Sequence, residues 1–127
     1  MAKASPRAQS KNVEVAAVTK AATRAADKLG LKNRTLATIL GLSEATISRM
    51  SKGGYQLNRG DKAFELGVLL VRLYRSLDAI VGGDETVARA WLVNHNTALR
   101  AAPINLIQTV GGLVNVIQYL DSRRAQI

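Results

Sequence analysis

The sequence predicts an all-α protein. Only 4% of the residues are aromatic, and alanine, leucine and valine fill most apolar positions, which favours packing between helices over pairing in sheets. Apolar residues recur at three- and four-residue spacing, and glycine follows several of these stretches where a helix would end. With 127 residues, of which 47% are hydrophobic, the chain can form one compact domain or two very small ones.

Positive charge is concentrated in the first half of the chain. The net charge is +9 and the sequence pI is about 10.5. Residues 1–62 carry 12 Lys or Arg against four acidic residues, whereas residues 63–127 carry six Arg against five acidic residues. A basic segment favours a polyanionic partner and a nearly neutral one does not. We therefore expect two functions in one short chain.

The beginning of the chain divides into an arm and a helix. Residues 1–12 are predicted to form a flexible basic arm, either an untethered terminus or a contact to phosphates. Residues 13–29 predict a helix, which Gly30 ends in a left-handed conformation. A basic ridge on this helix is either a solvated face or follows a phosphate backbone. The apolar face consists of Val18, Ala22, Ala25 and Leu29, and the basic ridge consists of Lys20, Arg24 and Lys28.

Residues 33–54, NRTLATILGLSEATISRMSKGG, predict two short helices joined by a tight turn. The first helix is expected over Thr35–Leu40 and the second over Glu44–Ser51. Gly41 suits the positive φ of the turn, and Ser43 is a good N-cap for the second helix. This arrangement is a helix-turn-helix motif. Its expected interior positions are Leu36, Ala37, Ile39, Leu40, Leu42, Ile47 and Met50.

The spacing A-x-x-x-G-L-x-x-x-x-I within this segment resembles the Xre/Cro-type helix-turn-helix of bacterial regulators. The resemblance implies a DNA-binding domain over residues 13–60, whose second helix enters the major groove. By that docking Glu44, Ala45 and Arg49 would face base edges. Ser43, Thr46 and Lys52 would then lie near phosphates. A plain helical hairpin without a role in DNA binding is the alternative.

A long helix is predicted from Asp61, its expected cap, to Val81. Its broad apolar stripe indicates burial against the C-terminal helices, against a second copy, or both. Gly82-Gly83 would end it, and Asp84 would start another helix that runs to about Asn94. The stripe consists of Leu66, Leu69, Leu70, Leu73, Leu77 and Ile80, and the inward residues of the following helix are Val87, Ala88, Trp91 and Leu92, with Trp91 as a core anchor.

Residues 103–120, PINLIQTVGGLVNVIQYL, predict two further helices. Pro103 would start the first helix, and Thr109 would cap or close the turn before the second. Gly111-Gly112 would then lie at the joint between them, with Leu106 and Ile107 facing inward.

This last third resembles the Xre/MbcA/ParS-type antitoxin toxin-binding domain, whose core reads P-x-x-L-[LI]-x-T-x-x-G-x-x-x-V-x-x-x-L. The chain departs from the family at Arg100-Ala101-Ala102, where members often carry glycine, and in its final residues DSRRAQI. The matching residues are Trp91, Leu92, Asn96, Ala98, Leu99, Pro103, Leu106, Ile107, Thr109, Gly112, Val116 and Leu120.

Together the two resemblances imply an antitoxin of a toxin–antitoxin system, with residues 61–127 as a helical dimerisation and toxin-binding domain. The implied partners are a RES-domain toxin that depletes NAD, operator DNA of the antitoxin's own operon, and a second copy of the chain. The antitoxin would cover the toxin's active site. The dimer would form through the helix after Asp61 or through the C-terminal domain. Residues suited to hydrogen bonds with the toxin are Arg100, Asn105, Gln108 and Asn115.

Two other classes of function compete with this interpretation. The first is an ordinary Xre-family transcription regulator whose C-terminal half only dimerises or senses a small molecule. The second is an enzyme, which the composition disfavours. The chain has no cysteine and a single histidine, His95, and it lacks paired carboxylates and a glycine-rich phosphate loop. We therefore expect no catalytic residues, no metal and no cofactor.

The start MAKASPRAQSKN has no apolar core typical of a secretory signal. No run of about 18 apolar residues suggests a membrane span. A cytoplasmic protein that joins the nucleoid when bound to DNA is expected.

Overall fold

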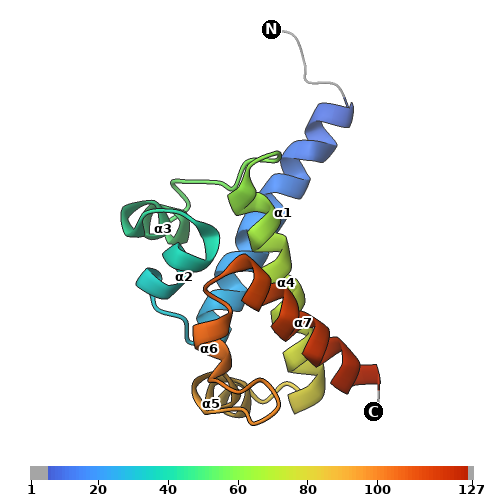
Figure 1. The fold of residues 1–127 in the computed structure, drawn as a ribbon. Helices are drawn as coiled ribbons and strands as arrows, with labels where there is room; N and C mark the ends of the chain where they lie inside the picture. The colour runs from blue at the N-terminus through green and yellow to red at the C-terminus, as the bar shows by residue number, and fades with distance from the viewer. Residues whose placement is uncertain (1–5, 126–127) are drawn as a thin grey trace, which may run out of the picture.

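The computed structural model describes residues 6–125, and side chains from Val13 onward. The described residues are helical throughout, apart from turns and one isolated bridge between Asn96 and Ala101, and contain no strand (Figure 1). The all-α prediction is confirmed. The helices are α1 (Pro6–Lys28), α2 (Asn33–Leu40), α3 (Glu44–Ser51), α4 (Lys62–Val81), α5 (Glu85–Val93), α6 (Pro103–Leu106) and α7 (Val110–Ala125).

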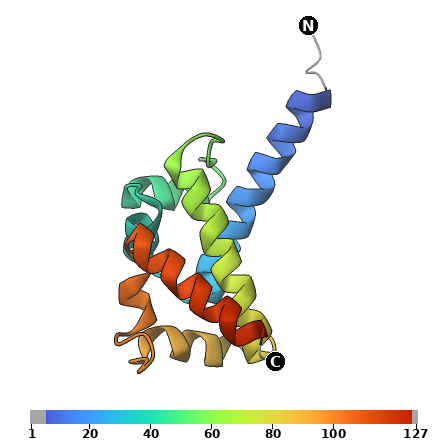
Figure 2. The same cartoon turned by 45° about the vertical axis from the view of Figure 1, so that its right-hand side comes forward.

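Helix α4 is the centre of the fold. It packs against α1 and α7 and also contacts α2 and α5, as both views of the ribbon show (Figures 1 and 2). Leu70, Leu73 and Leu77 are completely or almost completely buried, while Leu66, Leu69 and Ile80 are partly buried. The broad apolar stripe is thus covered within one chain, largely by α1 and α7. One hydrophobic core consequently joins the two halves of the sequence.

Helix α1 begins at Pro6, earlier than the predicted start at Val13. The predicted arm of residues 1–12 is therefore helical from Pro6 onward, and its first five residues lie outside the described part. Proline suits a helix start because its missing N–H would have no partner within the helix there. The N-terminal half of α1 extends beyond the other helices in both views (Figures 1 and 2).

Most of the predicted helix caps are confirmed. The side chains of Ser43 and Asp84 accept hydrogen bonds from the backbone amides of Thr46 and Val87. The prediction of a side-chain cap by Asp61 is wrong, because its carboxylate makes no capping hydrogen bond. The Asp61 main-chain carbonyl instead accepts from the amide of Phe64 at 3.1 Å, so the amide that the carboxylate would have capped is already bonded.

Helix α5 is less deeply buried than predicted. Ala88 and Leu92 are buried as expected, but Val87 is 48% exposed and was wrongly placed in the core. Trp91 is partly buried and stacks on Tyr119 of α7, with ring centroids 6.4 Å apart. The helix thus rests on the body along one narrow edge, and the tryptophan lies at the border of the core.

Polar contacts also attach α5 to the end of α1. The Arg89 guanidinium donates to the carbonyls of Lys28 and Asp27, at 3.0 and 2.9 Å. Lys28 and Glu85 form an ion pair at 2.9 Å, and this hydrogen bond raises the pKa of Lys28 and lowers the pKa of Glu85. The last carbonyls of α1 lack partners within the helix. Arg89 supplies a donor to the Lys28 carbonyl and a second donor to the Asp27 carbonyl, which also accepts from the Gly30 amide at 3.0 Å.

A buried serine connects α4 to α7. The hydroxyl of Ser76, which is 2% exposed, donates to the Asp121 carboxylate at 2.7 Å. Arg72 donates to the other carboxylate oxygen, also at 2.7 Å. The Ser76 hydrogen bond, followed by that of Arg72, holds the pKa of Asp121 below its ordinary value, although partial burial opposes the shift.

Replacing Asp121 with asparagine is expected to lower the free energy of unfolding at neutral pH by about 1 kcal/mol, because hydrogen bonds to a half-exposed charge contribute modestly. A carboxyl whose pKa is depressed by folding stabilises the protein above its unfolded-state pKa, and this contribution disappears as the pH falls through the folded-state pKa. The difference between wild type and Asp121→Asn should therefore shrink in acid. Urea unfolding of both proteins, at pH values from neutral to below the folded-state pKa of Asp121, measures this difference in the free energy of unfolding. The exposed Asp27→Asn is the control, and a difference for Asp121→Asn independent of pH would contradict the assignment.

Candidate functional site

The helix-turn-helix forms as the sequence predicts. Gly41 has φ +69°, and its amide and that of Leu42 donate to the Ala37 carbonyl. The second helix has the predicted bounds, and the first begins at Asn33, two residues early. Leu42 is partly buried at the turn. The predicted interior residues that are buried are Leu36, Ala37, Ile39, Leu40, Ile47 and Met50.

The exposed face of α3 carries the candidate DNA-binding residues. Ser43 Oγ lies 2.9 Å from Thr46 Oγ1 and accepts from the Thr46 amide at 3.1 Å. Arg49 Nη2 donates to Thr46 Oγ1 at 3.0 Å, so its guanidinium points toward the N-terminal end of α3. That is the end which a recognition helix inserts deepest into a major groove. Glu44, Ala45 and Lys52 are exposed on the same helix or at its C-cap.

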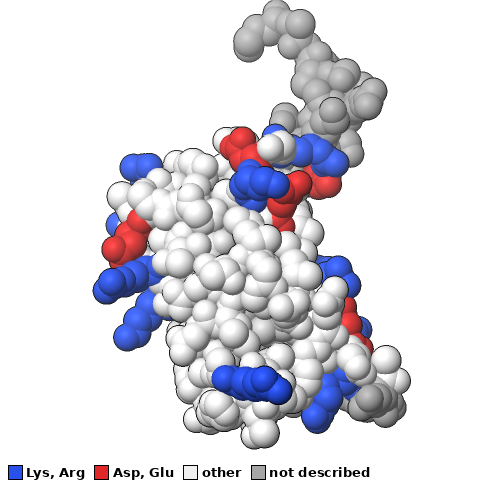
Figure 3. Space-filling model, viewed as in Figure 1, with Lys and Arg blue, Asp and Glu red and all other residues white. Residues whose placement is uncertain are grey.

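The charged side chains are unevenly distributed around the molecule. In the space-filling view, Lys and Arg project at the left edge, over α2 and α3, with acidic atoms between them, while the centre of the visible face is almost free of charge (Figure 3). A cationic edge suits a phosphate backbone, and an uncharged face suits contact with another protein.

Residues outside the motif hold α3 against the core. Thr19 of α1 is 7% exposed, and its hydroxyl accepts from the Leu57 amide at 3.0 Å and donates to the Val15 carbonyl at 2.9 Å. Leu57 is fully buried, and a Cβ on Gly67 of α4 would lie 2.8 Å from its Cδ1. The connection after α3 is therefore fixed between α1 and α4. The sequence analysis missed these contacts. The signal that could have found them is Leu57, an apolar residue in the otherwise polar connection between α3 and α4.

The four candidate toxin-binding residues lie on separate segments. Arg100 ends the turn after α5 with φ +61°, the only non-glycine positive φ among the described residues. Asn105 is exposed on α6, and Asn115 is exposed on α7. Gln108 is partly buried, and its Nε2 donates to the Ile104 carbonyl at 3.1 Å. No hydrogen bond joins the four in the described structure, and Gln108 is already engaged within the chain.

The motif residues explain the joint between α6 and α7. Pro103 is buried at the start of α6, and Thr109 Oγ1 accepts from the Gly112 amide at 3.1 Å. The joint consists of residues 107–109, so Gly111 and Gly112 lie in the first turn of α7, slightly beyond the predicted place. A Cβ on Gly112 would overlap the Leu106 carbonyl, whereas one on Gly111 meets nothing within 4 Å. Val116 and Leu120 are buried below this joint, and Leu99 and Leu106 are partly buried.

Within residues 6–125 no three His, Cys, Asp or Glu side chains come together as metal ligands. Over the same part of the chain no helix has the length and apolar character to cross a membrane.

Comparison with known families matches both parts of the chain. An antitoxin Xre-like helix-turn-helix domain model covers residues 8–72, and an antitoxin Xre/MbcA/ParS C-terminal toxin-binding domain model covers residues 76–125. No curated protein matches the sequence significantly. The helix-turn-helix implies DNA binding, and the second domain implies a toxin partner. The chain belongs to the Xre-type antitoxin family and combines a helix-turn-helix with a C-terminal toxin-binding domain.

Proposed function

We propose that this antitoxin neutralises a RES-type, NAD-depleting toxin by protein–protein binding and represses its own operon by binding operator DNA as a homodimer in the cytoplasm. The observation that carries the proposal is the order of the two domains, a Xre-type helix-turn-helix followed by the toxin-binding fold. Antitoxins of RES-type toxins share this order. No catalytic residue, metal or cofactor takes part in the proposed activity.

The exposed apolar side chains of the C-terminal part support a protein partner. Val87, Val93 and Val110 are 48%, 59% and 60% exposed, and together they account for most of the exposed large apolar side chains in the described structure. Burial of such side chains drives association, and nearby polar residues supply specificity. Arg100, Asn105 and Asn115 are exposed in the same part of the chain and remain our candidate hydrogen-bonding residues.

Co-expression with the product of the adjacent gene tests the antitoxin role. The neighbour alone should arrest growth and lower cellular NAD, and this chain should restore growth and co-purify with the neighbour. If the neighbour alone arrests growth without lowering cellular NAD, and this chain restores growth, the RES assignment would be removed but the antitoxin role would stand. Neither rescue nor a complex would leave the ordinary Xre-family regulator as the better description.

Replacing Arg49 with alanine is expected to weaken operator binding by ~1–3 kcal/mol and to relax the preference at one base pair, because arginine pairs with the O6 and N7 atoms of guanine. Fluorescence anisotropy with operator variants at fixed salt would measure both effects. Lys62→Ala is the control. The Lys62 side chain is 88% exposed, and among the described residues it pairs only with Glu65, three positions later on α4. Equal affinities for Arg49→Ala and wild type would contradict the placement of α3 in the major groove.

A further inference from the structure

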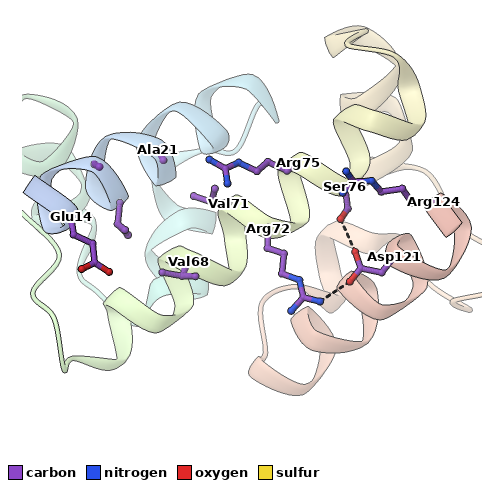
Figure 4. Close-up of a pocket in the computed structure, with 11 residues that line it drawn as sticks. Glu14, Ala21, Val68, Val71, Arg72, Arg75, Ser76, Asp121 and Arg124 are labelled. Carbon is purple, nitrogen blue, oxygen red and sulfur yellow. Dashed lines mark hydrogen bonds and ion pairs between the residues drawn. The ribbon is translucent and has the colours of Figure 1, made fainter.

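A groove of about 660 Å³ runs between α1 and α4 and reaches the last turns of α7 (Figure 4). Helices α1 and α4 lie side by side and run in the same direction, so the groove follows their length (Figures 1 and 2). Together with an adjoining hollow, it extends along α1 from Glu14 to Lys28, which is about 20 Å at the rise of an α-helix. The residues that line both are Ala17, Ala21, Val71 and Arg75.

The floor of the groove is apolar. It is formed by small and branched side chains, Ala17 and Ala21 of α1 and Val68 and Val71 of α4. Val68 is 43% exposed, so a large apolar side chain is open to solvent there. Val13 lies one helical turn before Ala17 and is 68% exposed, which extends the apolar strip along α1. An occupant with an apolar face of its own would remove this surface from water.

The acidic side chains of the groove are already paired within the chain. At one end Glu14 pairs with Arg59, and at the other end Asp121 pairs with Arg72. All nine acidic residues of the sequence lie within residues 14–121, so none belongs to the undescribed ends. The lining cations that have no ion-pair partner among residues 13–125 are Lys20, Arg24, Arg75 and Arg124.

These four cations flank the apolar floor from three helices. Lys20 and Arg24 are exposed on α1, one turn apart. Arg75 of α4 extends over the floor toward α1, and Arg124 of α7 lies at the end marked by Ser76 (Figure 4). Such a surface is complementary to an apolar stripe with acidic side chains on its flanks.

We infer that this groove binds an acidic amphipathic helix of another protein. Two neighbouring helices leave a groove into which a third can pack, with apolar anchors recurring every three or four residues. A helix of about four turns has the length of the groove. Its anchors would contact Ala17, Ala21 and Val68. Its flanking carboxylates would pair with Arg75 and Arg124.

The apolar floor favours a protein helix over a nucleic acid, because a phosphate backbone would pair with the cations and leave the floor uncovered. The position of the groove agrees with this choice. In both ribbon views α2 and α3 lie to the left of α4, whereas the last turns of α7 lie to the right (Figures 1 and 2). Arg124 is therefore remote from the candidate recognition helix. The groove is also at the opposite end of α7 from Val110, one of the valines proposed above for contact with the toxin.

A designed peptide tests the inference directly. The probe is a fluorescein-labelled helix of roughly 15 residues, with leucine along one face and glutamate on both flanks. Fluorescence anisotropy should show that it binds the wild-type chain. The same peptide with lysine in place of glutamate should bind at least roughly tenfold more weakly. No binding of the glutamate peptide, or equal binding of the two peptides, would overturn the inference.

Adjacent arginines on α7 provide a matched pair of variants. Arg124 lines the groove, whereas Arg123 lies over the ring of Tyr119, 6.0 Å from its centroid. Substitution of either arginine by glutamate changes the net charge equally. Arg124→Glu should weaken binding of the glutamate peptide roughly tenfold, and Arg123→Glu should weaken it less than about twofold. Equal losses would show that the overall charge of the chain, and not the groove, attracts the peptide.

Exchange of charge separates recognition from stability. A chain with both Arg75→Glu and Arg124→Glu should lose the glutamate peptide and bind the lysine peptide, a gain that partial unfolding would not produce. Val68→Asp, in the floor, should abolish binding of the glutamate peptide, whereas Val87→Asp, on exposed α5, should leave it unchanged. Circular dichroism establishes that each variant is folded.

Two results would assign the groove to a different occupant. If Arg124→Glu weakens binding of a non-operator DNA duplex as strongly as binding of the peptide, the groove contacts nucleic acid. If the wild type is a dimer in sedimentation equilibrium and Arg124→Glu dissociates it, a second copy fills the groove. Either result would overturn the inference. Loss of rescue in the co-expression test, with peptide binding intact, would instead remove the proposed function and leave the groove as assigned.

Discussion

Replacing Gly112 with alanine is expected to lower the free energy of unfolding by about 3 kcal/mol. The added Cβ would overlap the Leu106 carbonyl oxygen and lie 2.8 Å from the carbonyl carbon and 2.9 Å from Thr109 Oγ1. These are mainly backbone atoms, which cannot rotate away, so α6 and α7 must separate. Urea unfolding followed by Trp91 fluorescence measures the change, because that side chain stacks on α7.

Gly111, the neighbour of Gly112, supplies a matched control. Gly111 also lies in the first turn of α7, but a Cβ there meets nothing within 4 Å, and its φ is not positive. Gly111→Ala should therefore be neutral or stabilise the protein by up to about 1 kcal/mol, since alanine favours helix more than glycine does. Comparable destabilisation by both substitutions would show that helix propensity, and not the contact with α6, accounts for the glycines.

The second large effect is expected in the middle of α4. Leu73 is completely buried, and Leu73→Ala should cost ~2–5 kcal/mol through lost apolar contact and the cavity left behind. Val87→Ala, at a position 48% exposed, should cost less than about 1 kcal/mol. Thermal or urea unfolding of the two variants against wild type makes the comparison.

The same experiment tests whether the two halves unfold together. Because α4 contacts both α1 and α7, the Leu73 cavity should weaken the whole chain in one transition. Trp91 fluorescence reports the C-terminal half, and far-ultraviolet circular dichroism reports all helices. Coincident midpoints are expected for wild type and variant. Two separated transitions in either protein would mean that α4 does not couple the halves.

Features set by local chemistry were predictable from sequence. Gly41 and Ser43 identify the turn of the helix-turn-helix because a positive φ and an N-cap each require a narrow set of residue types. The motif P-x-x-L-[LI]-x-T-x-x-G placed Pro103 and Thr109 at helix starts, where the structure has them. The DNA and toxin contacts themselves stay predictions.

Features that depend on distant partners were not predictable. Val87 fits the apolar spacing of α5, but only the packing of α5 along one edge decides that it faces solvent. Arg89 looks like any exposed helical arginine until the end of α1 is brought beside it. Gly67 gave no signal in the sequence, because its role depends on Leu57 lying against α4. Such contacts arise from chain segments that come together only in the folded molecule.

The shared helix α4 limits how such antitoxins can be recombined. The boundary between the two matched domains, at residues 72–76, falls inside α4, and Leu70, Leu73 and Leu77 lie on both sides of it. A fragment cut there would expose leucine surface and be prone to aggregation. Exchange of DNA specificity between relatives is therefore expected to succeed by grafting the exposed face of α3, and to fail when whole domains are joined without matching α4 to α7.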